Sequence, residues 1–287
     1  MPHPPPTRPL TLIVATTPIR TAPETTDTPT RLGIGLKGTL PWPRIKSDMS
    51  FFARVTSRAP APGTTNAIIM GRKTYESVPK HLRPLAKRIS VIVTRDASGS
   101  VKEGVLQELE ARKAKLAAVA KAKAESQEKE SGNGNGETAE KKAIDPPQET
   151  IQSSPSPEPI TDAIVSTSLG AALHDLDASY GAEGRLGKIY VIGGAEIYGA
   201  ALRMEAGNEA EGRRPVRIVM TNVVRKVEGT TRPFECDTFF PLDAPPAQNQ
   251  WRAASAREVS EWVGEEVTGE WTQDGEVEVQ MVGFERV

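Results

Sequence analysis

The sequence is poor in the residues that build metal sites and disulfide frameworks. Its 287 residues include one cysteine and three histidines. A lone Cys236 excludes an internal disulfide and suits a reducing compartment. His3, His81 and His174 have no spacing typical of metal ligands or of a Ser-His-Asp triad. We therefore interpret the histidines as surface or packing residues and expect no bound metal.

The sequence also lacks net charge and long apolar runs. Lysine and arginine number 36 against 37 acidic residues, so the formal charge is -1. Such a chain has no overall field to attract nucleic acid or an acidic membrane, and must hold any anionic ligand by local contacts. The N-terminus has no signal-peptide pattern, and no segment has membrane-spanning length. We expect a cytoplasmic protein.

What the sequence does have is an alternation of buried-strand and helix patterns. Short apolar runs rich in β-branched residues predict strands at residues 10–15, 66–70, 89–94, 188–192 and 216–223. Helices are predicted at 47–57 and 169–176, and residues 276–281 alternate as an antiparallel strand does. These patterns predict one α/β domain at 8–287, with a mainly parallel central sheet, an antiparallel C-terminal strand and helices on both faces.

Residues 102–161 differ in composition from the rest and are predicted to be an insertion within the domain. Residues 103–130 are rich in Ala, Lys and Glu and predict a helix, whereas 131–159 are too poor in apolar residues to offset the entropy of ordering. A tolerated surface insertion is favoured over a partner-binding arm.

Two early segments are interpreted as loops. Residues 16–31, rich in Thr and Pro, predict an extended surface loop. The next segment, Gly33-Ile-Gly35-Leu-Lys-Gly38, matches the Gly-x-Gly-x-x-Gly pattern of dinucleotide-binding turns. It lacks the strand before and the helix after that such a turn needs. We interpret it as a mobile glycine-rich loop that can close over a ligand.

The strongest candidate for chemistry is Asp48. It lies in the first turn of a predicted helix that follows a Pro-Trp-Pro corner, and Met49, Phe52 and Val55 fall beside it at helical spacing. The acid therefore borders a buried face. These residues alone leave two interpretations open, because Asp in a first turn also stabilises the helix.

Cations and glycines stand at predicted strand ends. Arg72, Lys73 and Thr74 follow one strand, and Thr94 and Arg95 follow the next. In a parallel sheet these ends are neighbours, so the two groups could share one anion, although a solvated basic turn is an equal alternative. A Gly-Gly pair after residue 192 is typical of a pyrophosphate-binding turn or of tight helix packing.

In chain order these segments resemble the dihydrofolate reductase family, in the form of a eukaryotic, fungal-like member with a long insertion. Each motif is weak alone, but together they cover most of the chain outside the insertion. The motifs are Ile13-Val-Ala15, Gly33-Ile-Gly35, Leu40-Pro-Trp-Pro43, Ile69-Met-Gly-Arg-Lys-Thr74, Ser77-Val-Pro79, Arg83-Pro-Leu85 with Arg88, Val191-Ile-Gly-Gly194 with Tyr198, and Asp237-Thr-Phe-Phe-Pro241.

The resemblance implies NADPH-dependent reduction of 7,8-dihydrofolate to 5,6,7,8-tetrahydrofolate for one-carbon metabolism, by a cytoplasmic monomer that needs no nucleic acid or membrane. Two alternatives remain: the same-fold pyrimidine reductase of riboflavin synthesis, and a non-catalytic nucleotide-binding scaffold. Three departures from the family pattern are the lengthened segment before the glycines, the insertion, and Tyr75 in place of a tryptophan.

The resemblance also implies residue roles. Asp48 would grip the pterin and, with a water, support protonation of N5, while Thr221 orients the acid and Trp42 helps to hold the water. Arg88 would bind the carboxylate of the glutamate tail. The remaining substrate positions are Ile13, Ala15, Met49, Phe52, Ser77, Val78, Leu85, Ile192 and Tyr198. The cofactor positions are Ala15, Ile34, Gly35, Gly71, Arg72, Lys73, Thr74, Thr94, Arg95, Ile192, Gly193, Gly194, Ala195, Glu196 and Ile197.

Overall fold

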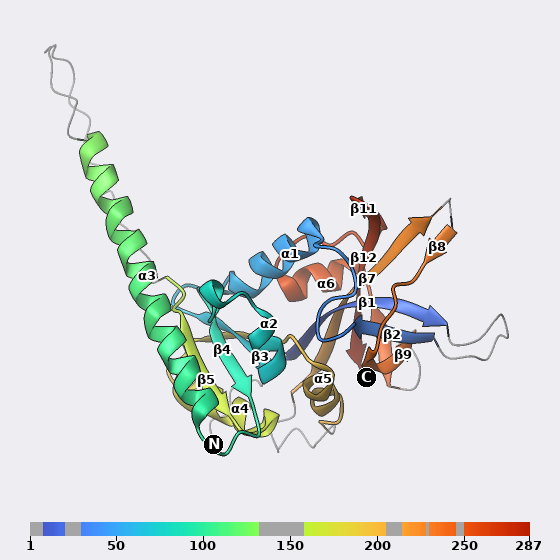
Figure 1. Cartoon of the computed structure of the whole chain (residues 1–287), viewed down its shortest axis with the longest axis horizontal. Helices are drawn as coiled ribbons and strands as arrows, with labels where there is room; N and C mark the ends of the chain where they lie inside the picture. Colours follow the sequence, from blue (N-terminus) through green and yellow to red (C-terminus); the bar gives the residue numbers. More distant parts are fainter. Residues whose placement is uncertain (1–7, 21–29, 132–157, 205–213, 228–229, 245–249) are drawn as a thin grey trace, which may run out of the picture.

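A twisted sheet runs through the centre of the computed structural model, which describes residues 8–20, 30–131, 158–204, 214–227, 230–244 and 250–287 (Figure 1). Its strands lie in the order β10-β12-β7-β1-β6-β3-β4-β5. Their bounds are β10 Trp251–Ala254, β12 Val277–Arg286, β7 Val216–Val227, β1 Leu10–Arg20, β6 Leu186–Val191, β3 Thr65–Gly71, β4 Ile89–Val93 and β5 Asp162–Ser166.

The strands from β7 to β5 pair in parallel, whereas β12 pairs antiparallel with β7. This arrangement confirms the predicted fold class. Four further strands attach at the margins: β2 Thr30–Gly35, β8 Thr230–Arg232, β9 Thr238–Ala244 and β11 Thr272–Asp274.

Helices cover both faces of the sheet. One face packs against α1 Lys46–Ser57 and α6 Ala256–Val263 through a cluster that includes Phe51, Val55 and Trp262. The other face packs against α4 Leu169–Leu176 and α5 Ala195–Leu202. The remaining helical segments are α2 Arg72–Ser77, η1 Lys80–Leu82, α3 Ser100–Ser131 and η2 Asp177–Gly181.

The predicted surface loop at residues 16–31 is wrong where the structure describes it. β1 continues to Arg20 and pairs antiparallel with β2, with Thr17 opposite Gly33. The Thr17 hydroxyl is buried and accepts a hydrogen bond from the backbone N–H of Phe234. Threonine is β-branched and favours strands, so its abundance here was a strand signal. Residues 21–29 lie outside the described residues.

The glycine-rich segment is also a strand rather than a loop over its first half. Gly33 and Gly35 belong to β2, which pairs with β1 and β9. A Cβ at Gly33 would stand 2.4 Å from the Cys236 sulfur, so close packing requires this glycine. Only Gly38, at φ +81°, lies in a turn that needs a left-handed backbone. The Asp237 carboxylate holds that turn by accepting from Lys37 N–H at 2.7 Å.

We predict that Gly33→Ala lowers the free energy of unfolding by about 1–3 kcal/mol, because overpacking forces neighbouring atoms to move. Gly104→Ala is the matched control: it lies in α3 with no atom within 4 Å of an added Cβ, and should raise stability by about 0.5–1 kcal/mol. Urea unfolding measures both, and an unchanged midpoint for Gly33→Ala would contradict the packing argument.

The predicted helix at 103–130 is confirmed as α3, and its base belongs to the body of the molecule. Val105 and Leu109 are buried, and the Tyr75 hydroxyl donates to Glu108 at 2.7 Å. The later turns extend away from the sheet (Figure 1). The predicted disorder falls mainly on residues 132–157, outside the described residues, and the boundaries of the insertion stay a prediction.

We predict that a deletion starting beyond the packed base of α3 leaves the fold intact. Replacing residues 117–157 by a short Gly-Ser linker should leave the melting temperature within a few degrees of that of the unaltered protein. The two ends to be joined are near each other, because Lys113 Nζ, before the deleted segment, lies only 3.7 Å from Asp162, after it. Deletion of residues 108–157 removes Glu108 and Leu109 and should destabilise by about 2–5 kcal/mol. Equal melting temperatures for the two deletion variants would show that the packed base of α3 does not contribute to the stability of the fold.

Candidate active site

The corner before α1 fixes where Asp48 stands. Trp42 and Ile45 are buried in a small cluster with Val223, and Trp42 meets Phe234 edge-on with ring centroids 6.0 Å apart. Ile45 occupies the N-cap position and offers no side-chain cap. Packing therefore decides where the helix begins, and Asp48 follows in its first turn as predicted.

A residue from the far end of the chain completes this helix start. Asp274, at the end of β11, accepts a hydrogen bond from the backbone N–H of Ser47 at 2.7 Å. It thus satisfies an N–H group that has no partner inside the helix. The sequence reasoning missed Asp274, since nothing in the local pattern links it to a helix 227 residues away.

Thr221 holds Asp48 from the sheet. It lies in β7 with Ala15 of β1 on one side and Met281 of β12 on the other, and its side chain is buried. Its hydroxyl forms a hydrogen bond with the Asp48 carboxylate. Because Thr221 sits on three paired strands, the acid is anchored to the most rigid part of the fold.

Burial raises the pKa of Asp48, the hydrogen bond from Thr221 opposes that rise, and the negative charge of Asp274 adds to it. The net direction is upward, so this carboxyl holds its proton more readily than an exposed aspartate. Tyr198 lies near enough for the charge of Asp48 to add to the effect of burial, and both raise the tyrosine pKa. Its hydroxyl donates to the Ile13 carbonyl at 2.6 Å.

The predicted substrate residues gather only in part. Ile13, Leu85 and Ile192 are half-buried and pack against the apolar cluster that contains Phe51. Ala15 is half-buried beside Thr221, and Val78 is half-buried after α2. Phe52 is half-buried, whereas Met49 is 43% exposed and Ser77 is exposed. The expected buried face of α1 therefore starts at Phe51 and Val55, with Met49 outside it.

Arg88 stands just before β4, at the amino-terminal edge of the strand. Its side chain is buried, with Nη1 donating to the Thr56 hydroxyl at 2.7 Å and Nε donating to the Ala86 carbonyl at 2.9 Å. Burial, followed by the positive charge of Arg112, lowers its pKa to about 10, which leaves it cationic at neutral pH. These contacts hold a guanidinium ready for an anion.

The carboxyl ends of β6, β3 and β4 lie side by side and bring the predicted cofactor residues to one edge. Gly193 has φ +119° and its carbonyl accepts from Gly71 N–H at 2.8 Å, which joins the ends of β6 and β3. Added Cβ atoms at Gly193 and Gly194 would each lie 3.5 Å from the Thr74 hydroxyl. The two glycines therefore place no side chain against that hydroxyl; Gly193 is buried and Gly194 is half-buried.

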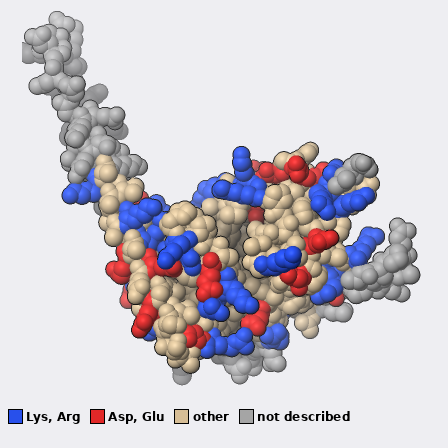
Figure 2. All heavy atoms as spheres, viewed as in Figure 1, with Lys and Arg blue, Asp and Glu red and all other residues tan. Residues whose placement is uncertain are grey.

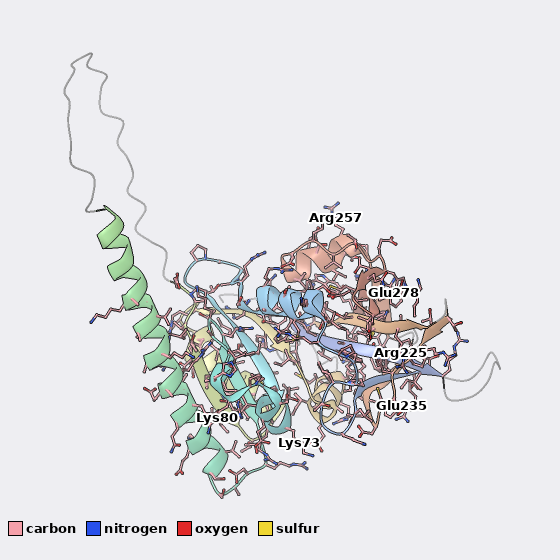
Figure 3. All side chains as sticks on the ribbon, turned by 45° about the horizontal axis from the view of Figure 1, so that its top comes forward. Lys73, Lys80, Arg225, Glu235, Arg257 and Glu278 are labelled. Atoms are coloured by element: carbon pink, nitrogen blue, oxygen red, sulfur yellow. The ribbon has the colours of Figure 1, made fainter. Side chains whose placement is uncertain are left out.

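The cations at this edge have carboxylate partners that the sequence did not indicate. Arg72 pairs with Glu76 one turn later at 3.0 Å, and Arg95 pairs with Glu196 of α5 at 3.2 Å. Lys73 is exposed beside them and projects from α2 (Figure 3). Charges of both signs are mixed on this face, as Figure 2 shows.

The remaining predicted cofactor residues lie around the same edge or in β2. Thr94 accepts a hydrogen bond from the Asp96 N–H at 3.1 Å. Ala195 is half-buried, Glu196 is exposed and Ile197 is buried in the first turn of α5, while Ile34 is half-buried in β2 with Gly35. A separate cavity of about 260 Å³ beside Leu186 and Trp262 lies at the opposite, amino-terminal edge of the sheet.

Known proteins that resemble this chain are dihydrofolate reductases. A family model described as dihydrofolate reductase matches residues 28–129. Dihydrofolate reductase of Pneumocystis carinii is 28% identical over 274 residues, covering 93% of this chain and 91% of that protein. The chain is similar to dihydrofolate reductases over most of its length.

Other relatives match shorter stretches. Dihydrofolate reductase of Aedes albopictus is 50% identical over 68 residues, which is 24% of this chain and 36% of that protein. A solved structure of Schistosoma mansoni dihydrofolate reductase is 22% identical, with a TM-score of 0.53, and the match covers 98% of this chain and 100% of that one. This likeness supports the same fold.

Within the described ranges, no group of three or more His, Cys, Asp or Glu is arranged to hold a metal ion. No helix in that part of the chain is long and apolar enough to cross a membrane.

We predict opposite effects of Asp48→Asn on activity and stability. Turnover should fall by about 10²–10⁴-fold, because an amide cannot supply the charge or the proton. The substitution should also stabilise the fold at neutral pH. The pKa of Asp48 is higher in the folded protein than in the unfolded chain, so the fold disfavours the ionised carboxyl. The free-energy cost of ionising Asp48 in the fold therefore grows as pH rises from the pKa of the unfolded chain through that of the folded protein.

Urea unfolding at several pH values measures the stability effect. The advantage of Asp48→Asn should be largest at neutral pH and shrink in acid. A variant that is destabilised at neutral pH would show that Asp48 serves only the helix start. Ser50→Ala, at an exposed position of the same helix, is the control.

Proposed function

We propose that this protein is an NADPH-dependent reductase that converts 7,8-dihydrofolate to 5,6,7,8-tetrahydrofolate. The observation that carries the proposal is Asp48, a half-buried carboxyl that is tied to Thr221 and stands behind the packed Trp42 corner. Similarity to dihydrofolate reductases gives that geometry its chemical meaning. Neither alternative, the pyrimidine reductase or the scaffold, is favoured by a specific observation.

The Asp48 carboxylate suits the pterin ring. Its two oxygens can accept parallel hydrogen bonds from the 2-amino group and the neighbouring ring N–H, as carboxylates do with amidine-like edges. Thr221 fixes the rotation of the carboxyl, and the raised pKa favours a proton held near the ring. Ile13, Leu85 and Ile192 supply an apolar wall that excludes water.

The other end of the substrate is acidic and meets Arg88. In our proposal one carboxylate of the glutamate tail binds the guanidinium group that Thr56 and Ala86 hold in place. A planar guanidinium can donate two parallel hydrogen bonds to a carboxylate, which lysine cannot reproduce. The substrate is then held at both ends, with the reacting ring between them.

The residues at the carboxyl edge of the sheet fit NADPH. The glycines after β6 place no side chain beside Thr74, and Gly194 is the N-cap of α5 without a side-chain cap, so the first N–H groups of the helix can meet the pyrophosphate. Arg72, Lys73 and Arg95 offer charge for a 2′-phosphate. When bound, the cofactor supplies the hydride that reaches C6 of the substrate.

We also propose that the protein acts as a monomer in the cytoplasm. The lone cysteine suits a reducing compartment. The substrate-binding and cofactor-binding residues of the proposal all belong to one chain, so catalysis does not need a second copy.

The direct test mixes the purified protein with NADPH and dihydrofolate and follows cofactor oxidation. Turnover supports the proposal, and Asp48→Asn shows that it belongs to this site. A folded protein that binds NADPH but does not oxidise it with dihydrofolate would overturn the proposed substrate. Supplying the pyrimidine substrate of riboflavin synthesis instead tests the first alternative.

We predict that Arg72→Ala combined with Arg95→Ala weakens NADPH binding by at least about 10-fold and NADH binding by less than about 3-fold, since only NADPH carries the 2′-phosphate. The reciprocal control is Glu76→Gln combined with Glu196→Gln. It removes the carboxylates that pair with the two arginines and should tighten NADPH binding modestly, because exposed ion pairs are weak. An unchanged preference for NADPH over NADH in both double variants would show that these arginines are only solvated surface residues and do not bind the 2′-phosphate.

A further inference from the structure

A cavity of about 260 Å³ opens at the amino-terminal edge of the sheet, away from the proposed reductase site. Its apolar wall is formed by Pro9, Pro60, Leu186 and Trp262. β6 begins at this cavity with Leu186, and its opposite end leads to Gly193 at the proposed cofactor site. Because β6 is a strand of 6 residues, it spans roughly 20 Å. The cavity is therefore separate from the residues proposed to bind substrate and cofactor.

The register of the sheet places two cations at this cavity. Arg217 of β7 lies opposite Thr11 of β1, and Thr11 lies opposite Tyr190 of β6. Paired residues of a parallel sheet point to the same face, and Lys188 points the same way because it precedes Tyr190 by two residues in β6. Lys188, Thr11 and Arg217 all line the cavity. The sheet face that α6 covers therefore presents both cations to one space.

Lys188 reaches from β6 to α6. Its Nζ donates to the Trp262 carbonyl at 2.7 Å and so satisfies a carbonyl in the last turn of that helix. An ammonium group has three N–H donors, and among the described residues this carbonyl is the only acceptor that Lys188 Nζ contacts. Burial, and after it the positive charge of Arg217, lowers the pKa of Lys188. A negative charge in the cavity would oppose both effects.

Arg217 is also only partly satisfied. Its Nε donates to Glu285 at 2.9 Å, but the same carboxylate accepts from Arg252 at 2.7 Å. Within the part of the chain that the structure describes, the Nη atoms of Arg217 have no acceptor. The guanidinium lies over the Trp262 ring, 4.7 Å from its centroid, and this contact holds it beside the cavity. Both cations therefore have N–H donors to offer a ligand.

Glu261 is the carboxylate of the cavity lining. Its side chain is 62% exposed and pairs with Arg257, one turn earlier in α6, at 3.0 Å. An exposed pair of this kind interacts weakly and leaves Glu261 largely in solvent. The lining therefore offers more positive than negative charge beside an apolar wall.

We propose that this cavity binds a small aromatic carboxylate. The apolar wall encloses the rings, and the carboxylate accepts hydrogen bonds from Lys188 Nζ and from an Nη atom of Arg217. A cavity of about 150 Å³ is enough for benzene, so one of about 260 Å³ has room for two fused rings. This site does not depend on the proposed reductase activity.

The experiment uses three probes: 2-naphthoate, its neutral analogue 2-naphthamide, and acetate, which has the carboxylate without the rings. Titration calorimetry with the full chain should give 2-naphthoate a Kd on the order of 0.1 mM, as expected of a ligand of this size. The amide should bind at least about 10-fold more weakly, because it loses the charged hydrogen bonds. Acetate should also bind at least about 10-fold more weakly, because it has no rings to bury.

The indole N–H signals of tryptophan locate the bound probe. In a ¹⁵N NMR spectrum, the Trp262→Phe variant identifies the signal of Trp262. 2-Naphthoate should shift that signal more than the signal of Trp42, which lies in the corner before α1 at the proposed active site. A larger shift at Trp42 would place the probe in the proposed active site and overturn the inference.

Lys188→Met keeps the apolar stem of the side chain and removes its charge. It should weaken 2-naphthoate binding at least about 5-fold and leave the affinity for 2-naphthamide within about twofold. Lys80→Met is the matched control: Lys80 is exposed on another part of the molecule (Figure 3), and its replacement should change neither affinity. Equal losses of both affinities in Lys188→Met would mean that Lys188 only caps α6, which contradicts the inference.

The comparison of the three probes needs no variant, so it decides the question even if Lys188→Met does not fold. If 2-naphthamide binds as tightly as 2-naphthoate, the cavity does not recognise a carboxylate. If acetate binds as tightly as 2-naphthoate, the cations bind anions without an apolar subsite. Either result overturns the inference, and neither bears on the proposed reductase activity.

Discussion

The hydrogen bond between Thr221 and Asp48 is the interaction on which the rest of the site depends. It joins the first turn of α1 to a strand held between β1 and β12, so a position on a short helix becomes as well defined as the centre of the sheet. Without it, burial would leave the carboxyl with no compensating donor. The buried residues Trp42 and Ile45 before α1, and Asp274 at the start of that helix, preserve the geometry that lets this bond form.

The same sheet distributes the other functions along its margin. The carboxyl ends of the parallel strands β6, β3 and β4 lie at one edge, where Gly193 and Gly194 place no side chain beside Thr74 and two arginines form ion pairs with Glu76 and Glu196. These pairs are exposed and therefore easily exchanged for a phosphate. At the other end of β4, Arg88 is held by the Thr56 hydroxyl and the Ala86 carbonyl. One continuous scaffold thus separates the acid from the cations that we propose bind the cofactor and from the arginine that we propose binds the substrate's tail.

Local patterns in the sequence predicted strands β1, β3, β4, β6, β7 and β12, the first-turn position of Asp48 and the neighbouring cationic strand ends, because each follows from spacing along the chain. They missed contacts between distant segments. Asp274 reaches α1 from the C-terminal hairpin, and Gly33 is required by Cys236 rather than by a loop. The packed base of α3 was hidden because Val105 and Leu109 are too few to produce an amphipathic signal over a long polar helix. Residue roles in binding stay predictions.

The central claim is that the fold holds Asp48 as a carboxyl with a raised pKa, and a direct titration tests it. The carboxyl carbons of aspartate can be labelled with ¹³C and followed by NMR across pH, with the Asp48→Asn spectrum identifying the signal. The account predicts a midpoint above the ordinary aspartate value of 3.8, and a lower one when Asp274→Asn removes the nearby charge. A midpoint at or below 3.8, insensitive to Asp274, would contradict it.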